Sequence, residues 1–259
     1  MTGRNAAGIM GKPAKNLTDF NTYLADLLDG PTASDAPVVA YFDLDRTLID
    51  GYSITSLALE KMWSGTLSPK RIVHHAGIFL HWGLGWSDYH QLLENTVGAL
   101  AGISEAEIVE LGERAFERRI KPIIYEEGRQ LIEAHKRLGH EPVLVTSATR
   151  YQALPIARDL GIEQIYCTEL EIAQGVITGN ATPCYGPGKK KAADVHMGFR
   201  EAELTDAFFY TDSCEDLPLL EEVGRPVAVN AKASLARLAS EQGWPQLEFE
   251  TLPTAARAA

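Results

Sequence analysis

The stretch Val38–Asp50, VVAYFDLDRTLID, contains the most informative feature of the chain, two carboxylates one residue apart. Its apolar start predicts a buried strand, and Asp43 and Asp45 follow at the carboxyl end of that strand. Side chains alternate faces along a strand, so both aspartates are expected to project toward the same side. A bound Mg²⁺ would relieve their repulsion, because this ion prefers oxygen ligands. An exposed loop after a strand is the plain alternative, and a DxD pair alone does not exclude it.

Three further segments carry polar groups after apolar or flexible stretches. They are Pro142–Ser147 (PVLVTS), Gly186–Lys191 (GPGKKK) and Ala207–Asp216 (AFFYTDSCED). The first and third read as strands, and the second is a loop that leads three lysines into a predicted helix. The polar side chains that they deliver are Thr146 and Ser147, the lysines, and Asp212 with Asp216. Four such segments in one chain make the exposed-loop alternative for Asp43 a poor explanation.

The sequences DLDRT, TS, GK and DSCED occur in the order of the four signature motifs of the haloacid dehalogenase (HAD) superfamily, which the chain resembles. Within that superfamily it is most similar to the phosphoserine-phosphatase-like group, subclass IB, over residues 38–230. The resemblance implies an α/β fold, in which a Rossmann-like parallel sheet carries an inserted helical cap of the C1 type. It also implies a Mg²⁺-dependent hydrolase.

Phosphoryl transfer needs a nucleophile, cations around the phosphoryl oxygens, and a proton donor for the leaving alcohol. Asp43 is the predicted nucleophile, which would form an aspartyl-phosphate. Asp45 is the predicted acid and base, which would protonate the alkoxide and then deprotonate the attacking water. The resemblance implies Asp212 as the main Mg²⁺ carboxylate beside Asp43, the backbone carbonyl of Asp45 as a further ligand, and a supporting position for Asp216.

Phosphate binding is predicted for the hydroxyl pair and for one of the lysines. Thr146 and Ser147 end the second segment, where Ser147 can donate a hydrogen bond to a phosphoryl oxygen and Lys189 can neutralise its charge. Lys189 directly follows the second glycine of its loop, which matches the GxGK pattern of the family. Lys190 and Lys191 remain alternatives for this role, because the lysine run leaves the register open.

The position of Asp45 also distinguishes reaction types within the superfamily. Dehalogenases resembling this fold lack an acid two residues after the nucleophile, whereas phosphatases and phosphomutases have one, so Asp45 favours phosphate esters. Transport ATPases of the superfamily carry threonine there and need membrane spans. Thr47 is expected to support the turn by a hydrogen bond to the backbone near Asp45, and a helix cap is an equal alternative.

Composition narrows the class of protein. A chain of 259 residues can bury a substantial core, and its formal net charge of -11 argues against nucleic-acid binding. Its three cysteines form no CxxC pair, which predicts reduced thiols. No apolar stretch is long enough for a signal peptide or a bilayer span, so we expect a cytoplasmic enzyme without integral membrane association. The expected partner is a small phosphorylated metabolite, and the oligomeric state stays open.

Helical and strand patterns alternate after residue 122, which predicts a parallel sheet with helices on both faces and a hairpin around Gly175. From residue 53 to about 121 the pattern is wholly helical. The expected divisions are an N-terminal tail and helix over 1–35, the core over 36–52 and 122–245, the cap over 53–121, and a C-terminal tail over 246–259. The expected cap helices lie near 53–64, 68–82, 87–100 and 104–118.

Two positions separate this chain from the phosphoserine phosphatases that it resembles. Those enzymes carry a glutamate where this chain has Tyr52 and an arginine where it has Thr96, so both contacts to the amino acid part of phosphoserine are expected to be missing. The predicted cap also contains an aromatic group, namely Phe79, Trp82, Trp86 and Tyr89. Facing the site, these rings would favour a larger or more apolar ester such as a lysophospholipid headgroup. Packing inside the cap is their more common role.

The pattern therefore predicts a Mg²⁺-dependent phosphatase, phosphoserine-phosphatase-like, that hydrolyses a small phosphomonoester through phospho-Asp43. The alternatives are a phosphatase for a larger or more apolar phosphoester, a phosphomutase with the same aspartates, and a non-hydrolytic phosphoester-binding protein. Release of free phosphate would separate hydrolysis from the last two.

Overall fold

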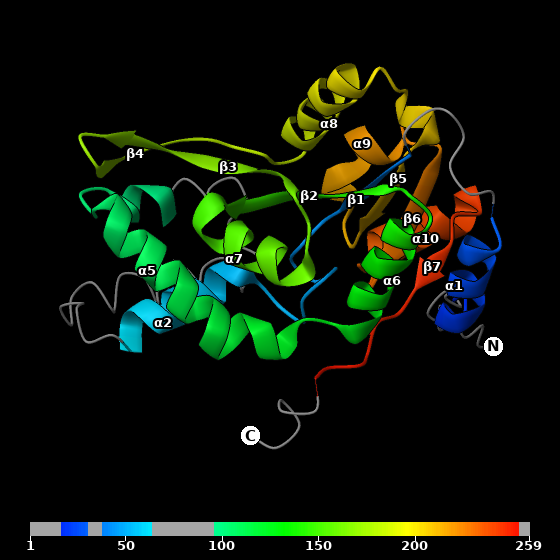
Figure 1. Ribbon diagram of the computed structural model, residues 1–259, viewed down its shortest axis with the longest axis horizontal. Coiled ribbons are helices and arrows are strands. Elements are labelled where there is room, and N and C mark those ends of the chain that lie inside the picture. The colour runs from blue at the N-terminus through cyan, green and yellow to red at the C-terminus, as the bar shows by residue number, and fades with distance from the viewer. Residues whose placement is uncertain (1–16, 31–37, 64–95, 254–259) are drawn as a thin grey trace, which may run out of the picture.

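A seven-stranded sheet forms the centre of the computed structural model, which describes residues 17–30, 38–63 and 96–253 (Figure 1). The strand order is β4-β3-β2-β1-β5-β6-β7, and β4 pairs antiparallel with its neighbour while the other pairs are parallel. The strands are β1 (Val39–Phe42), β2 (Glu141–Thr149), β3 (Gln164–Ala173), β4 (Val176–Thr182), β5 (Phe208–Thr211), β6 (Arg225–Val229) and β7 (Gln246–Leu247). The predicted α/β class with a mostly parallel sheet is confirmed.

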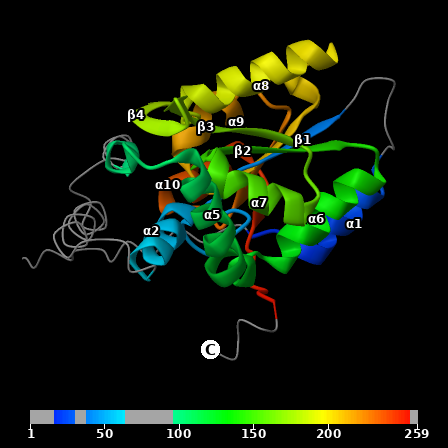
Figure 2. The same ribbon diagram turned by 60° about the vertical axis from the view of Figure 1, so that its left-hand side comes forward.

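Helices cover both faces of this sheet, as Figures 1 and 2 show. One face carries α1 (Phe20–Leu28), α6 (Glu126–Arg137) and α7 (Arg150–Leu160), and the other carries α8 (Pro187–Arg200), α9 (Leu217–Leu220) and α10 (Ala233–Gln242). The central strand β1 explains the arrangement, because Ala40 and Phe42 pack in the first apolar cluster while Val39 and Tyr41 pack in the second. Strands buried on both faces read as continuous apolar runs.

After the loop that follows β1, the described chain up to α6 is mainly helical. It contains α2 (Ser53–Trp63), helical residues 96–100, α5 (Glu105–Ala115), a π-helical turn η1 (Phe116–Ile120) and a 3₁₀ turn η2 (Lys121–Ile123). Ser104 starts α5, since its side chain accepts a hydrogen bond from the backbone of Glu107. The expected helix near 68–82, most of that near 87–100, and the aromatic group from Phe79 to Tyr89 lie outside the described residues.

The hairpin of β3 and β4 turns at Gln174 and Gly175, which both have positive φ, and extends over α5 (Figure 1). Its backbone bonds directly to the segment before α5. Gly102 N donates to Ile177 O at 2.9 Å, and Ile177 N donates to Ile103 O at 2.9 Å. Leu170 and Ile177 of the hairpin also share an apolar cluster with residues of that segment and of α5. Residues 96–115 are therefore attached to the hairpin by hydrogen bonds and by apolar packing.

The C-terminal boundary of the core differs from the expected one. Gln246 and Leu247, assigned to a tail, form β7 and pair with Ala228 and Val229 of β6. Phe249 is 3% exposed and lies in the main apolar cluster, where its ring meets Phe20 of α1 edge to face. The prediction of a tail from residue 246 was wrong for Gln246, Leu247 and Phe249. So short a strand has no pattern of its own, because its hydrogen bonds come only from a partner strand earlier in the sequence.

Candidate active site

The predicted site residues lie at the carboxyl edge of the central strands. Phe42 of β1 stands opposite Leu144 of β2 and Tyr210 of β5 in the two parallel ladders, and Asp43 N donates to Tyr210 O at 2.9 Å. The residues that continue these three strands therefore meet at one edge of the sheet, where open α/β sheets bind ligands.

Lys189 joins two of the predicted aspartates. Its Nζ lies 2.7 Å from Oδ1 of Asp43 and 2.8 Å from Oδ2 of Asp216, and its side chain is 3% exposed. Thr211 Oγ1 donates to the same Oδ2 of Asp216 at 2.5 Å. Burial and these two ion pairs hold the ammonium in one place. We call Asp43, Asp45, Asp212, Asp216 and Lys189 the Asp43 cluster.

The start of α8 selects Lys189 from the three lysines. Pro187 occupies the first turn of the helix, and a Cβ on Gly188 would lie 2.8 Å from Pro183 O, so only glycine fits this approach. Lys190 points elsewhere, since its Nζ pairs with Asp194 one turn along the helix at 2.9 Å. Lys189 is therefore the lysine that reaches Asp43.

Burial and charge oppose one another at the Asp43–Lys189 pair. Burial raises the pKa of Asp43, and the ammonium of Lys189 opposes that rise. Burial opposes the charge on Lys189, but the ion pairs with Asp216 and Asp43 outweigh it and raise its pKa. The lysine thus stays protonated, and it favours the ionised form of Asp43 that a nucleophile needs.

Asp45 is held by the start of α2. Ser53 N donates to Oδ1 of Asp45 at 2.7 Å, while burial raises the pKa of this carboxyl to about 6 against that hydrogen bond. Ser53 Oγ in turn accepts from Gln152 of α7 at 3.0 Å. Gln152 also caps α7, since its Oε1 accepts from N and Oγ1 of Thr149. The same contacts that start two helices fix the position of Asp45.

Asp212 contacts two cations that the sequence did not single out. Its Oδ2 lies 3.2 Å from Nε of Arg46 and 3.8 Å from Nζ of Lys232. Burial raises the pKa of Asp212 to about 6, and both cations oppose that rise. Arg46 stands between Asp45 and Thr47 within the first motif, so its position was visible in the sequence. Lys232 follows β6, and nothing local in the sequence indicates its role.

The hydroxyl residues of the prediction have different environments. Thr146 Oγ1 accepts from Ala148 N at 3.1 Å, and Ser147 is buried at the same sheet edge. The side chain of Thr47 differs from the expectation, because its Oγ1 is buried and has no hydrogen-bond partner among the described residues. The turn is held by backbone groups instead, since Leu44 O accepts from N of Thr47 and Leu48. The predicted Thr47 hydrogen bond was therefore wrong.

Tyr52 and Thr96 occupy different surroundings. Burial raises the pKa of Tyr52, and the charged groups that act on its phenol include Asp45 and Asp212, which places it beside the Asp43 cluster. Thr96 begins the helical residues 96–100, whose buried members Val97 and Leu100 belong to the apolar cluster of the hairpin. The structure thus brings Tyr52 into the electrostatic surroundings of Asp45.

A divalent cation fits this edge of the sheet. Asp43 and Asp212 are buried carboxylates, and burial raises the pKa of both, so a further cation beside them would stabilise their ionised forms. Mg²⁺ is bound in proteins by one or two carboxylates together with waters and phosphate oxygens. In the described part of the chain no three His, Cys, Asp or Glu side chains form a complete metal cage. Two carboxylates and a backbone carbonyl are the ligand set that the resemblance implies, and such a set leaves positions open for water and substrate.

The family of the chain follows from its sequence. A family model for haloacid dehalogenase-like hydrolases matches residues 40–221, which include every member of the Asp43 cluster. The chain belongs to this family. It is a HAD hydrolase, and the predicted resemblance is confirmed.

Two relatives of this hydrolase are named as phosphatases. A histidinol-phosphatase of Neisseria meningitidis is 32% identical over 225 residues, covering 82% of this chain and 99% of the relative. A phosphoserine phosphatase of Mycobacterium tuberculosis is 32% identical over 233 residues, covering 86% of this chain and 74% of the relative. The prediction of a HAD-family phosphatase, similar to phosphoserine phosphatase, is thereby confirmed, and the two names leave the ester open.

Solved structures agree on the fold. A protein of unknown function from Bordetella pertussis has a TM-score of 0.73 and 27% identity, covering 82% of this chain and 98% of that one. A phospho-aspartyl intermediate analogue of phosphoserine phosphatase has a TM-score of 0.61 and 19% identity, covering 85% and 96%. Among the described residues, no helix of this HAD hydrolase has the length and apolar character that a membrane span requires.

Proposed function

We propose that this HAD phosphatase hydrolyses a small phosphomonoester with Mg²⁺ and forms a covalent intermediate on Asp43. The observation that carries the proposal is the ion pair between Lys189 and Asp43 at 2.7 Å. Because Lys189 engages Oδ1 of Asp43, we assign Oδ2 as the attacking atom. The new bond joins this oxygen to phosphorus while the bond from phosphorus to the alcohol oxygen breaks.

Asp45 supplies the proton for the departing alcohol. Its Oδ1 accepts from Ser53 N, so the proton belongs on Oδ2. Burial raises the pKa of Asp45 to about 6, which favours the protonated form that an acid needs. After the alcohol leaves, the ionised Asp45 takes a proton from water, the water oxygen bonds to phosphorus, and the bond to Asp43 breaks. Inorganic phosphate is released and both aspartates return to their starting state.

The charge of the phosphoryl group needs cations and hydrogen-bond donors. Lys189 is the buried cation beside Asp43, and Ser147 with Thr146 supplies hydroxyls at the same edge. Asp43, Asp212 and the backbone carbonyl of Asp45 would hold Mg²⁺, which supplies further neutralisation of the phosphoryl oxygens. Asp216 supports the site because it fixes Lys189 from the other side.

The leaving alcohol is a separate question from the reaction. The names of the two relatives point to phosphoserine and to histidinol phosphate, so both esters are candidates for this chain. Tyr52 lies beside Asp45, where phosphoserine phosphatases carry a glutamate, and a phenol does not supply the negative charge that an ammonium group prefers. We therefore expect a small phosphomonoester, with phosphoserine a poorer substrate than in those enzymes.

The test is phosphate release from phosphoserine, histidinol phosphate and a lysophosphatidate, each with Mg²⁺ or with EDTA, and with the Asp43→Asn protein as the blank. Mg²⁺-dependent release that the variant lacks would support the proposal, and the preferred ester would name the substrate class. Conversion to an isomeric ester without free phosphate would instead indicate a mutase. Binding of the esters without turnover would indicate a non-hydrolytic role.

A further inference from the structure

One oxygen of Asp212 has two cations around it. Its Oδ2 faces Arg46 Nε at 3.2 Å and Lys232 Nζ at 3.8 Å. Asp212 is also a carboxylate that the proposed function assigns to Mg²⁺. A guanidinium and a metal ion compete for the same lone pairs, because each needs the oxygen within direct contact distance. The position of Arg46 therefore bears on how the site takes up its metal.

The two cations are held very differently. Lys232 is fixed by several contacts, since its Nζ also reaches Ser213 Oγ at 3.1 Å and Glu215 Oε2 at 3.4 Å, and its backbone N donates to Asp212 O at 2.9 Å. Among the described residues, Arg46 pairs with one carboxylate, Asp212, and its side chain is 40% exposed. Arg46 is thus the cation that can leave Asp212 at low cost.

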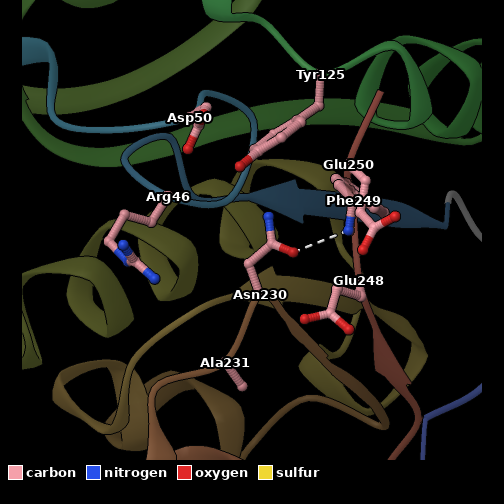
Figure 3. Close-up of a pocket in the computed structure, with 8 residues that line it drawn as sticks. All are labelled: Arg46, Asp50, Tyr125, Asn230, Ala231, Glu248, Phe249 and Glu250. Carbon is pink, nitrogen blue, oxygen red and sulfur yellow. Dashed lines mark hydrogen bonds between the residues drawn. The ribbon is translucent and has the colours of Figure 1, made fainter. Parts of the chain in front are cut away.

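Arg46 also lines a cavity of about 250 Å³ (Figure 3). The residues that line it are Arg46, Asp50, Tyr125, Asn230, Ala231, Glu248, Phe249 and Glu250. Three of these carry carboxylates and one carries a cation, so the cavity has a surplus of negative charge. Figure 3 shows Arg46 and Asp50 at one side of the cavity, with Glu248 and Glu250 at the other.

The backbone of Arg46 restricts movement to its side chain. Its φ of 63° lies in the left-handed region, which a non-glycine residue adopts only when the surrounding structure holds it there. Arg46 N donates to Gly51 O at 3.0 Å, which closes the loop around Thr47. A fixed backbone with a long, half-exposed side chain gives the guanidinium two anionic places within its reach, Asp212 and the cavity.

We propose that Arg46 is a positioning residue whose side chain has two alternative positions. It pairs with Asp212 in the metal-free enzyme and turns to the cavity carboxylates when a divalent cation binds. The inference rests on the proposed function, because it takes Asp212 as a metal ligand. In the metal-free state the guanidinium keeps Asp212 compensated and oriented. In the metal-bound state the guanidinium of Arg46 pairs with the carboxylates of Asp50 and Glu250. The ion pair thereby lowers the affinity for Mg²⁺.

The test is isothermal titration of Mg²⁺ into the full chain. Arg46→Gln should bind Mg²⁺ about three- to tenfold more tightly than the wild type, since it removes a half-exposed competing ion pair. Arg46→Lys should stay close to the wild type because it retains the charge. The matched control is Arg200→Gln, which removes an equally exposed arginine, 41% against 40%, from its pair with Glu141 on another part of the fold.

A double variant of the cavity, made in the wild type and in the Arg46→Gln protein, tests where the Arg46 side chain goes when Mg²⁺ binds. Asp50→Asn with Glu250→Gln should weaken Mg²⁺ binding about two- to threefold in the wild type and leave it unchanged in the Arg46→Gln protein. The inference would be overturned if Arg46→Gln bound Mg²⁺ no more tightly than the wild type. It would also be overturned if the Asp50 and Glu250 substitutions weakened Mg²⁺ binding equally in both backgrounds. In either case, phosphate release by the wild type would still uphold the proposed function. A wild type that neither binds Mg²⁺ nor releases phosphate would overturn both. Thermal unfolding in EDTA verifies that each variant is folded.

Discussion

Two clusters in the described part of the chain each surround a buried charge with groups of the opposite sign. In the Asp43 cluster one ammonium, Lys189, lies among carboxylates and is 3% exposed. Between α2 and η1 one carboxylate, Glu60, lies among guanidinium groups and is 2% exposed. Its Oε1 is 3.1 Å from Arg118 Nη1 and 3.8 Å from Arg114 Nε, and its Oε2 is 3.1 Å from Arg119 Nε. We call these four residues the Glu60 cluster.

The surplus charge differs in its exposure to water. The surplus arginines of the Glu60 cluster reach solvent, and the side chain of Arg118 is 69% exposed. The surplus aspartates of the Asp43 cluster are buried, and their pKa values are raised for that reason. Hydrated surplus charge costs little, whereas buried surplus charge is relieved only by a proton or by a ligand of the opposite sign. The comparison therefore supports the proposed ligand-binding role of the Asp43 cluster, and it predicts a structural role for the Glu60 cluster.

The largest expected effect separates the two clusters by activity. Asp43→Asn should lower the rate of phosphate release by at least about a thousandfold, because the amide is a poor nucleophile. Glu60→Gln should lower it by less than about tenfold, because it removes no group from the reaction. Both proteins would be assayed at saturating ester and Mg²⁺, with circular dichroism as the test of folding. Comparable losses in the two proteins would contradict the division of roles.

The second prediction compares the two clusters by stability. Lys189→Met should lower the free energy of unfolding by about 3–5 kcal/mol, since it strands Asp43 and Asp216 in a buried place. Glu60→Gln should cost less, about 1–3 kcal/mol, because its arginines keep their contact with water. Denaturant unfolding in EDTA measures both values. Lys190→Met is the matched control, because it removes an exposed lysine pair and should change the stability least. A smaller cost for Lys189→Met than for Glu60→Gln would reverse the comparison.

The third prediction concerns pH. Burial raises the pKa values of Asp45 and Asp212 from 3.8 to about 6, so between these values the native protein holds more protons than the unfolded chain. These two groups therefore stabilise the native protein fully below pH 3.8, and this stabilisation is lost as the pH rises toward 6. Each group contributes a slope of up to about 1.4 kcal/mol per pH unit.

The measurement is urea unfolding of the metal-free protein between pH 4 and 7. Asp45→Asn should remove the contribution of that residue to the pH dependence. The slope of the free energy of unfolding against pH should therefore become shallower by up to about 1.4 kcal/mol per pH unit. Saturating Mg²⁺ should change the dependence as well, because only the ionised carboxylates bind the metal. An unchanged slope in Asp45→Asn would show that this carboxyl is not a source of buried surplus charge.

The smallest effect is expected from a cross-link at the start of α5, the helix whose last turn carries Arg114 of the Glu60 cluster. Ser104 and Val176 form an antiparallel bridge between the start of α5 and the hairpin. A disulfide in the Ser104→Cys, Val176→Cys protein should change the rate by less than about twofold, because this contact is already made by backbone hydrogen bonds. The reduced form of the same protein is the control. A large loss on oxidation, restored by reduction, would show that residues 96–115 must leave the hairpin during turnover.

Much of the site could be predicted because apolar runs and motif spacing are local properties of the chain. Asp43, Asp45 and Asp212 each follow an apolar run, and the carboxyl ends of parallel strands meet at one edge. The lysine register was also available in principle, since Asp194 stands four residues after Lys190 and offers it a partner on the same helix face.

Other features required partners far apart in the sequence. Lys232 reaches Asp212 only because the end of β6 lies beside the end of β5. The strand β7 is too short to be recognised without β6. Glu60 is a single acidic residue in a helix, and its three arginines belong to a segment about fifty residues later. None of these contacts leaves a periodic signal in the chain.

The sequence by itself determined the α/β class, the motif order and the four aspartates of the Asp43 cluster, because apolar periodicity and motif spacing act over short stretches of chain. Only the tertiary structure decided which lysine reaches Asp43, that Arg46 and Lys232 share one oxygen of Asp212, and that the surplus charge around Glu60 is hydrated. The physical reason is that burial and ion pairing depend on which distant segments the fold brings together, and these decide the pKa values on which the chemistry rests.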